Sequence, residues 1–147
     1  MKKLRIHKTD LYLVAKQLLS ECEKNSSEWA SVVALSGDLG AGKTTLTKSI
    51  AKILEIKKDI TSPTFVIEKV YGIPKKTKSK FCRLIHIDAY RLENSYELDV
   101  LGWHEIVNDS SNIIFIEWPE NVKKALPTDT LWVKLTHVDD TTRDIEW

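Results

Sequence analysis

The chain is poor in cysteine, and its two cysteines stand far apart. Cys22 and Cys82 are the only ones among 147 residues. So small a number excludes a disulfide framework and a cysteine-based metal cluster. We expect both side chains to fill the core, with Cys22 on the apolar face of a helix and Cys82 in a strand. Internal repeats, low-complexity tracts and linkers are also missing, so the sequence shows no domain boundary.

An excess of charge and a long apolar run are missing as well. Lys and Arg number 22 and Asp and Glu 21, for a net charge of +1, so bulk electrostatics does not indicate nucleic acid or an anionic membrane as the main partner. No apolar run approaches the roughly 18 residues of a membrane-spanning helix. The basic start, Met1-Lys2-Lys3, is not followed by the apolar region of a secretory signal. We expect one domain over residues 1–147, a reducing cytoplasmic setting and no membrane partner.

A glycine-rich loop is the most informative feature that is present. Residues 37–44 read Gly-Asp-Leu-Gly-Ala-Gly-Lys-Thr, which fits the phosphate-binding loop pattern. The glycines let backbone N–H groups approach phosphate oxygens. Lys43 would reach the β- and γ-phosphates, and the Thr44 hydroxyl would ligate Mg²⁺. The apolar run at 31–36 predicts a buried strand before the loop, and helical spacing to about residue 55 predicts a helix after it, which is the context that this motif needs.

The remaining pattern predicts an α/β protein. A first helix is capped by Thr9 or Asp10 and carries its apolar face as far as Cys22. Further helices are expected over 93–107, weakened in the middle by Gly102, and over 119–126 after a proline. Strands are expected at 65–71, 81–88, 112–117, 131–136 and 142–147, the first two forming a hairpin. Strands separated by helices predict a mixed, mostly parallel sheet flanked by helices, as a single P-loop NTPase-like domain.

Two carboxylates end apolar strands and are candidate partners of the loop. Glu117 follows four apolar residues, whereas the run before Asp88 is interrupted by His86. One acid would hold magnesium and the other would orient a water molecule. The alternative for each is a helix cap or a surface ion pair. Thr64, in a loop after Pro63, offers a hydroxyl that would order around magnesium and the γ-phosphate, as in a GTPase switch.

Four lysines gather in the predicted turn of the hairpin, namely Lys75, Lys76, Lys78 and Lys80. Two interpretations stay open. They form a solvated loop, or they dock RNA or an acidic partner.

Several separated motifs together resemble one family. The sequences of residues 37–45, 62–65, 86–92, 97–102 and 116–120 occur in the order found in the TsaE family, formerly YjeE. This family is the bacterial ATPase of tRNA threonylcarbamoyladenosine synthesis, and the resemblance runs from Thr9 to Arg143. It implies ATP and Mg²⁺ as cofactors and the TsaD and TsaB proteins as partners.

The resemblance also implies a division of work. TsaD transfers a threonylcarbamoyl group to an adenosine next to the anticodon of tRNAs that read codons starting with A. The ATPase would drive a step that lets this machinery turn over, with weak hydrolysis on its own. Two alternatives stay open for tRNA, an indirect contact through the partner proteins and a direct one.

Residue by residue, the resemblance places Lys43 on the phosphates as a catalytic residue, Thr44 and Glu117 on magnesium, and Asp88 as the catalytic or water-positioning acid. Thr64 belongs to the switch-like loop. Thr9 and Arg143 match positions that line the nucleotide pocket. Trp118 either packs against the sheet or acts directly. The loop supplies the rest of the nucleotide-binding set: Gly37, Asp38, Leu39, Gly40, Ala41, Gly42 and Thr45.

Two other functions are compatible with a phosphate-binding loop. A small-molecule or nucleotide kinase would carry an arginine-rich lid, and Arg83, Arg91 and Arg143 are scattered instead. An ATP-gated assembly module would bind nucleotide without needing hydrolysis. The guanine-reading pattern Asn-Lys-x-Asp does not occur, which favours ATP over GTP.

Overall fold

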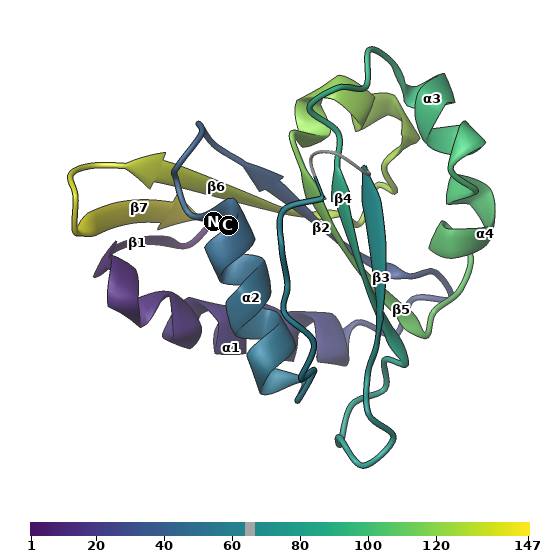
Figure 1. Ribbon diagram of the computed structural model, residues 1–147, viewed down its shortest axis with the longest axis horizontal. Helices are drawn as coiled ribbons and strands as arrows, with labels where there is room; N and C mark the ends of the chain where they lie inside the picture. The colour runs from purple at the N-terminus through teal and green to yellow at the C-terminus, as the bar shows by residue number, and fades with distance from the viewer. Residues whose placement is uncertain (64–66) are drawn as a thin grey trace.

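A sheet of seven strands forms the centre of the molecule in the computed structural model, which describes residues 1–63 and 67–147 (Figure 1). The strand order is β1-β7-β6-β2-β5-β4-β3. The strands are β1 (Lys3–His7), β2 (Ser31–Ser36), β3 (Glu68–Gly72), β4 (Arg83–Asp88), β5 (Asn112–Glu117), β6 (Leu131–His137) and β7 (Thr142–Glu146).

The sheet is parallel at its centre and antiparallel at both sides. Strands β6, β2, β5 and β4 pair in parallel, while β1–β7, β7–β6 and β4–β3 are antiparallel pairs. Strand β5 is buried along its length and β2 as far as Leu35, and their centres read as apolar runs because both faces of a central parallel strand are covered. The predicted mixed sheet with flanking helices is confirmed.

Helices cover the two faces of the sheet (Figure 1). Helices α1 (Leu11–Lys24) and α2 (Lys43–Ile53) pack on one face over Val33, Leu35 and Phe115. On the other face, α3 (Ser95–Val100), α4 (Trp103–Val107) and the 3-10 helix η2 (Pro119–Ala125) pack over Ile85, Ile87 and Ile114. Alternate residues of each central strand therefore belong to different hydrophobic clusters.

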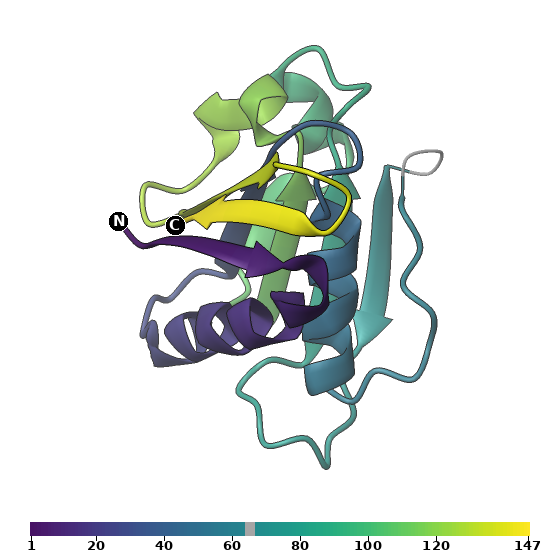
Figure 2. The ribbon, with the colours of Figure 1, turned by 90° about the vertical axis from the view of Figure 1, so that its left-hand side faces the viewer.

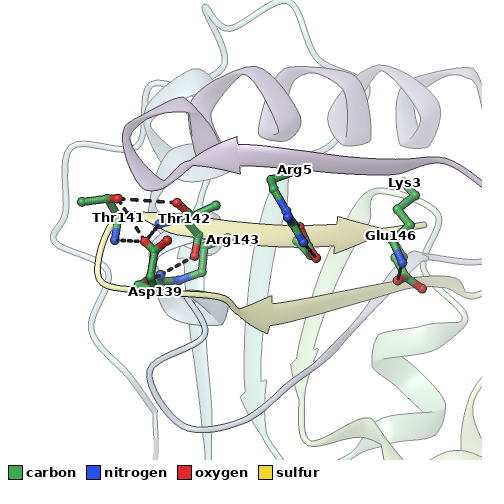
Figure 3. A network of polar contacts seen from close by, with 8 residues as sticks. Lys3, Arg5, Asp139, Thr141, Thr142, Arg143 and Glu146 are labelled. Carbon is green, nitrogen blue, oxygen red and sulfur yellow. Dashed lines mark hydrogen bonds and ion pairs between the residues drawn. The ribbon is translucent and has the colours of Figure 1, made fainter.

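Strand β1 is an element that the sequence pattern did not predict. It is mostly exposed and follows a short N-terminal segment, so it lacks an apolar signature. It is held to β7 by backbone pairing and by Arg5, which donates to Asp144 over 2.7 and 2.8 Å (Figure 3). Lys3 and Glu146 add an ion pair of 2.8 Å. The 3-10 helix η1 (Lys8–Asp10) then leads into α1.

Three other predictions need correction. The helix expected at 93–107 is two short helices, α3 and α4. Gly102 lies between them with φ +80°, a conformation that interrupts an α-helix. Cys22 is buried, as expected, but Cys82 precedes β4 and is exposed, so its placement in a strand and in the core was wrong. Strand β3 starts at Glu68, and residues 65–66 of the predicted strand lie outside the described residues.

None of the helices within residues 1–63 and 67–147 combines the length and the apolar character needed to cross a membrane.

Candidate nucleotide and magnesium site

The glycine-rich loop connects the end of β2 to the start of α2, as its motif requires. Gly37 has φ +141°, and a Cβ at this position would lie 2.3 Å from the carbonyl oxygen of Leu135 on β6. Only glycine fits there, because both the backbone conformation and the space exclude a side chain. A Cβ at Gly40, which has φ +78°, would meet nothing within 4 Å. The loop is thus packed tightly at its base and open at its tip.

Lys43 is the first residue of α2 and is turned back over the loop. Its Nζ donates hydrogen bonds to the carbonyl oxygens of Gly37 over 2.5 Å and of Asp38 over 2.9 Å. Nζ also lies 4.7 Å from the centre of the Trp118 ring. Burial lowers the pKa of the Lys43 amine, and the charges of nearby carboxylates, Glu117 first among them, oppose this shift. The amine is held where a phosphate above the loop would meet it.

Glu117 ends β5 and faces the first turn of α2. Its Oε1 accepts a hydrogen bond of 2.7 Å from the Thr44 hydroxyl and lies 2.9 Å from His86 Nε2. Burial alone would raise the pKa of this carboxyl. The hydrogen bonds from His86 and Thr44, with the charges of His86 and Lys43, outweigh burial, so the pKa lies below its ordinary value. Glu117 is therefore held as a carboxylate.

Asp88 ends β4, and its Cα is the register partner of the Glu117 Cα across the parallel pair β4–β5. It is 4% exposed, and its Oδ1 accepts a hydrogen bond of 2.9 Å from the Tyr90 N–H. The carboxyl ends of β2, β4 and β5 meet at one edge of the sheet, where open parallel sheets bind their ligands. The two predicted acids and the loop are therefore brought together.

A cavity of about 460 Å³ joins these groups, a size common for small-molecule sites. One wall is aromatic, because the Tyr90 and Trp118 rings lie 5.1 Å apart and tilted by 57°. Trp118 adopts φ +56°, a left-handed conformation that turns the chain sharply after Glu117. The lining residues are Leu39, Gly40, Gly42, Lys43, Thr44, Thr45, Ser62, Asp88, Tyr90, Glu117 and Trp118.

Arg143 lies beside the loop, and neither Arg143 nor Thr9 is among the described residues that line this cavity. Arg143 is buried on β7, where its Nε donates to the Ala41 carbonyl oxygen over 3.2 Å. Its Nη1 donates to the Asp139 carbonyl oxygen over 2.6 Å (Figure 3). Thr9 is exposed in η1, with its hydroxyl 2.7 Å from His7 Nδ1. Thr64 lies outside the described residues, although its neighbour Ser62 lines the cavity.

His86 is the site residue that sequence reasoning missed. Its side chain is fully buried on β4, and Nδ1 has no hydrogen-bond partner among the described residues. An unpaired buried polar atom costs free energy. The other ring nitrogen, Nε2, is paired with Glu117. The available signal was a lone polar residue inside an otherwise apolar strand, two positions before an acid on the same face.

The donor set fits a magnesium ion better than a softer metal. Thr44 and Glu117 offer hard oxygen ligands at the base of the cavity, beside the loop. In the part of the chain that the structure describes, no group of three or more His, Cys, Asp or Glu side chains is placed to hold a metal by itself. Magnesium commonly takes one or two protein ligands and completes its shell with phosphate oxygens and water, so these residues fit the cation as a partner of a nucleotide.

Comparisons with known proteins agree on one family. The model of the family "Threonylcarbamoyl adenosine biosynthesis protein TsaE" matches residues 7–145. The tRNA threonylcarbamoyladenosine biosynthesis protein TsaE of Haemophilus influenzae is 37% identical over 123 residues, which cover 84% of this chain and 73% of that protein. The protein of the same name from Rickettsia bellii is 38% identical over 114 residues, covering 77% of this chain and 74% of the relative.

A solved structure matches the fold. The crystal structure of YdiB from Bacillus subtilis is similar with a TM-score of 0.69 and 28% sequence identity, over 98% of this chain and 83% of that one.

Proposed function

The chain belongs to the TsaE family, and we propose that it is a magnesium-dependent ATPase that acts with the TsaB and TsaD proteins in the threonylcarbamoyl modification of tRNA. The observation that carries this proposal is the convergence of Lys43, Glu117 and Asp88 on one cavity above the glycine loop. On this proposal the chain acts in the cytoplasm, where tRNA is modified.

The loop and Lys43 would hold the phosphates. Backbone N–H groups of residues 40–44 and the N-terminus of α2 favour negative charge, and the 11-residue helix supplies its dipole. The Lys43 amine would exchange its bonds to the Gly37 and Asp38 carbonyls for bonds to β- and γ-phosphate oxygens. Binding therefore costs little rearrangement, because the amine already lies over the loop.

Thr44 and Glu117 would hold the magnesium ion, which neutralises charge on the phosphates when bound. Their oxygens are already 2.7 Å apart, so they converge on one place. A carboxylate kept ionised by its neighbours is ready to act as a ligand or to bind a metal-bound water.

Asp88 would orient the attacking water. It stands beside Glu117 across the strand pair and lines the same cavity, on the side of Tyr90 and Trp118. A positioned carboxylate of this kind orients the nucleophile and accepts its proton. Two neighbouring acids can thus divide the work between cation and water.

The positions of the arginines support the expectation that ATP turnover is weak without a partner. Enzymes of this chemistry use an arginine to stabilise the transition state, and the cavity lining among the described residues contains none. Arg83 is paired with Asp109, and Arg143 is bound behind the loop. The same distribution weighs against a kinase, which needs an arginine-rich lid.

The test is ATP turnover measured with and without the TsaB–TsaD complex, for the wild type and for Glu117→Ala. We expect the complex to raise the wild-type rate and the variant to lose both magnesium-dependent turnover and support of tRNA modification. A wild-type rate that the complex leaves unchanged would contradict the proposal. A variant that binds ATP and supports modification normally would instead identify an ATP-gated assembly module.

A further inference from the structure

Seven exposed lysines gather at the end of the molecule opposite the glycine loop. They come from two segments. One is the second half of α2 together with the turn that follows it, and the other is the loop between β3 and β4. Figures 1 and 2 both place the end of α2 and this loop side by side at the bottom of the molecule, away from the start of α2. We call the seven lysines the basic surface; they are Lys48, Lys52, Lys57, Lys58, Lys75, Lys76 and Lys78.

Direct contacts hold the two segments together. The Thr77 hydroxyl lies 3.2 Å from the Leu54 carbonyl oxygen, at the end of α2, and 3.0 Å from Glu55 Oε2. Lys57 and Lys58 border two hollows at once. One, of about 440 Å³, is shared with Lys48 and Lys52, and the other, of about 300 Å³, reaches the β3–β4 loop at Pro74. The lysines therefore belong to one continuous surface.

Positive charge exceeds negative charge on this surface. Within residues 1–63 and 67–147, none of the seven lysines forms an ion pair, whereas Lys2 and Lys3 elsewhere do. Asp59 and Glu55 line the two hollows with these lysines, and Glu23 accepts hydrogen bonds from the loop residues Ser79 and Lys80. A chain with a net charge of only +1 thus concentrates its positive potential at one end.

We propose that the basic surface binds the phosphodiester backbone of RNA. That the RNA is tRNA rests on the function proposed above; the binding itself does not. Lysine is a flexible point charge suited to phosphates, and the surface has no arginine or exposed aromatic ring with which to read bases. Binding should therefore be independent of sequence and strongly dependent on salt.

An acidic protein is a poorer fit to the same surface. The cores of protein interfaces are depleted of lysine and enriched in aromatic residues. Val70 is the half-exposed apolar side chain beside these lysines, and it is not aromatic. The exposed aromatic ring of Tyr90 lies instead at the nucleotide cavity. The chemistry favours a polyphosphate strand over a protein face.

The location of the surface predicts simultaneous binding. Helix α2 begins at Lys43 in the nucleotide site and ends at the basic surface, and its 11 residues span roughly 16 Å. RNA at one end would leave the cavity at the other end open. Of the two alternatives that the sequence leaves open, this inference is the direct contact with tRNA.

The experiment measures binding of a fluorescently labelled, unmodified tRNA transcript by anisotropy at about 50 and 200 mM salt. The test variant is Lys57→Gln, Lys58→Gln, Lys75→Gln and Lys76→Gln combined. The matched control makes the same charge change at exposed lysines elsewhere: Lys8→Gln, Lys16→Gln, Lys124→Gln and Lys134→Gln. ATP binding with magnesium is measured for both variants, so a failure of the nucleotide site is recognised separately.

We expect the wild type to bind and to lose affinity steeply with salt. The test variant should bind at least about tenfold more weakly at low salt, with a salt slope reduced by about one for each lost phosphate contact. The control should keep the wild-type affinity, and an unrelated tRNA should bind equally well. Equal losses in both variants, or tRNA binding unchanged by the test variant, would overturn the proposal. So would a test variant that keeps tRNA but loses the TsaB–TsaD complex, because the surface would then serve a protein.

Discussion

Asp88 and Glu117 stand directly opposite each other across two parallel strands, at the edge of the sheet where the glycine loop begins. Both are almost fully buried, at 4% exposure each, yet their environments differ. Glu117 is held by Thr44 and His86, whereas Asp88 accepts from the backbone of Tyr90. Neighbouring carboxylates with different partners are suited to different roles.

The two acids should therefore fail in different ways when neutralised. Asp88→Asn should bind ATP with magnesium within about threefold of the wild type but turn over roughly 10²–10⁴ times more slowly, because the water loses its positioning group. Glu117→Gln should instead need about 100-fold more magnesium, since a cation ligand is weakened. Binding of a fluorescent ATP analogue across a magnesium series, with turnover measured in parallel, separates the two. Identical behaviour of the variants would remove the division of roles.

His86 should act through the position of Glu117. His86→Gln keeps an N–H near the place of Nε2, whereas His86→Asn does not reach Glu117. We expect the asparagine variant to need roughly 10- to 100-fold more magnesium for nucleotide binding, and the glutamine variant to recover most of this loss. Nucleotide binding in EDTA should change little in either. The exposed His104→Asn is the matched control. If both His86 variants bind magnesium alike, the contact is only structural.

Two glycines of the loop should differ sharply in their tolerance of alanine. Both have positive φ, so each substitution costs about 1–2 kcal/mol of backbone strain. At Gly37 the new Cβ would also meet the Leu135 carbonyl oxygen at 2.3 Å, and overpacking adds about 1–3 kcal/mol. We expect urea unfolding to show Gly37→Ala losing about twice as much stability as Gly40→Ala. Equal losses would mean that the loop relaxes away from β6.

The two cysteines should react at very different rates. Burial raises the pKa of the Cys22 thiol to about 12, whereas Cys82 is exposed. A thiol reagent at pH 8 should label Cys82 quickly and Cys22 only after unfolding, and Cys82→Ser should leave a native protein that reacts slowly. Equal native rates for both thiols would contradict the burial of Cys22.

The same thiol predicts a direction for stability at high pH. The unfolded chain releases the Cys22 proton near the ordinary pKa of 9.0, and the folded chain keeps it to about 12. Its contribution to stability is therefore complete below pH 9 and is lost as the pH rises through this window. The loss should be smaller in Cys22→Ala when urea unfolding is compared at pH 8 and pH 10.5. An equal loss in the two proteins would assign the effect to other groups.

The sequence predicted the centre of the sheet and the glycine loop because their signals are local. Apolar runs identify β2 and β5, and glycine spacing identifies the loop. Strand β1 was missed because its partner β7 lies at the other end of the chain, and backbone pairing leaves no mark on an exposed segment. His86 was missed for a related reason. Its importance comes from Glu117 on the neighbouring strand, which is 31 residues away in sequence.

The base of the loop rests on the last two strands. Leu135 on β6 closes the space behind Gly37, and Arg143 on β7 grips the Ala41 carbonyl oxygen. The conformation of the phosphate-binding loop therefore depends on two distant stretches of sequence. A transplanted segment of residues 31–55 alone would lack the contacts from β6 and β7 that support the loop. Substitutions in the hairpin of β6 and β7 can therefore impair nucleotide binding even though every residue of the glycine-rich motif is unchanged.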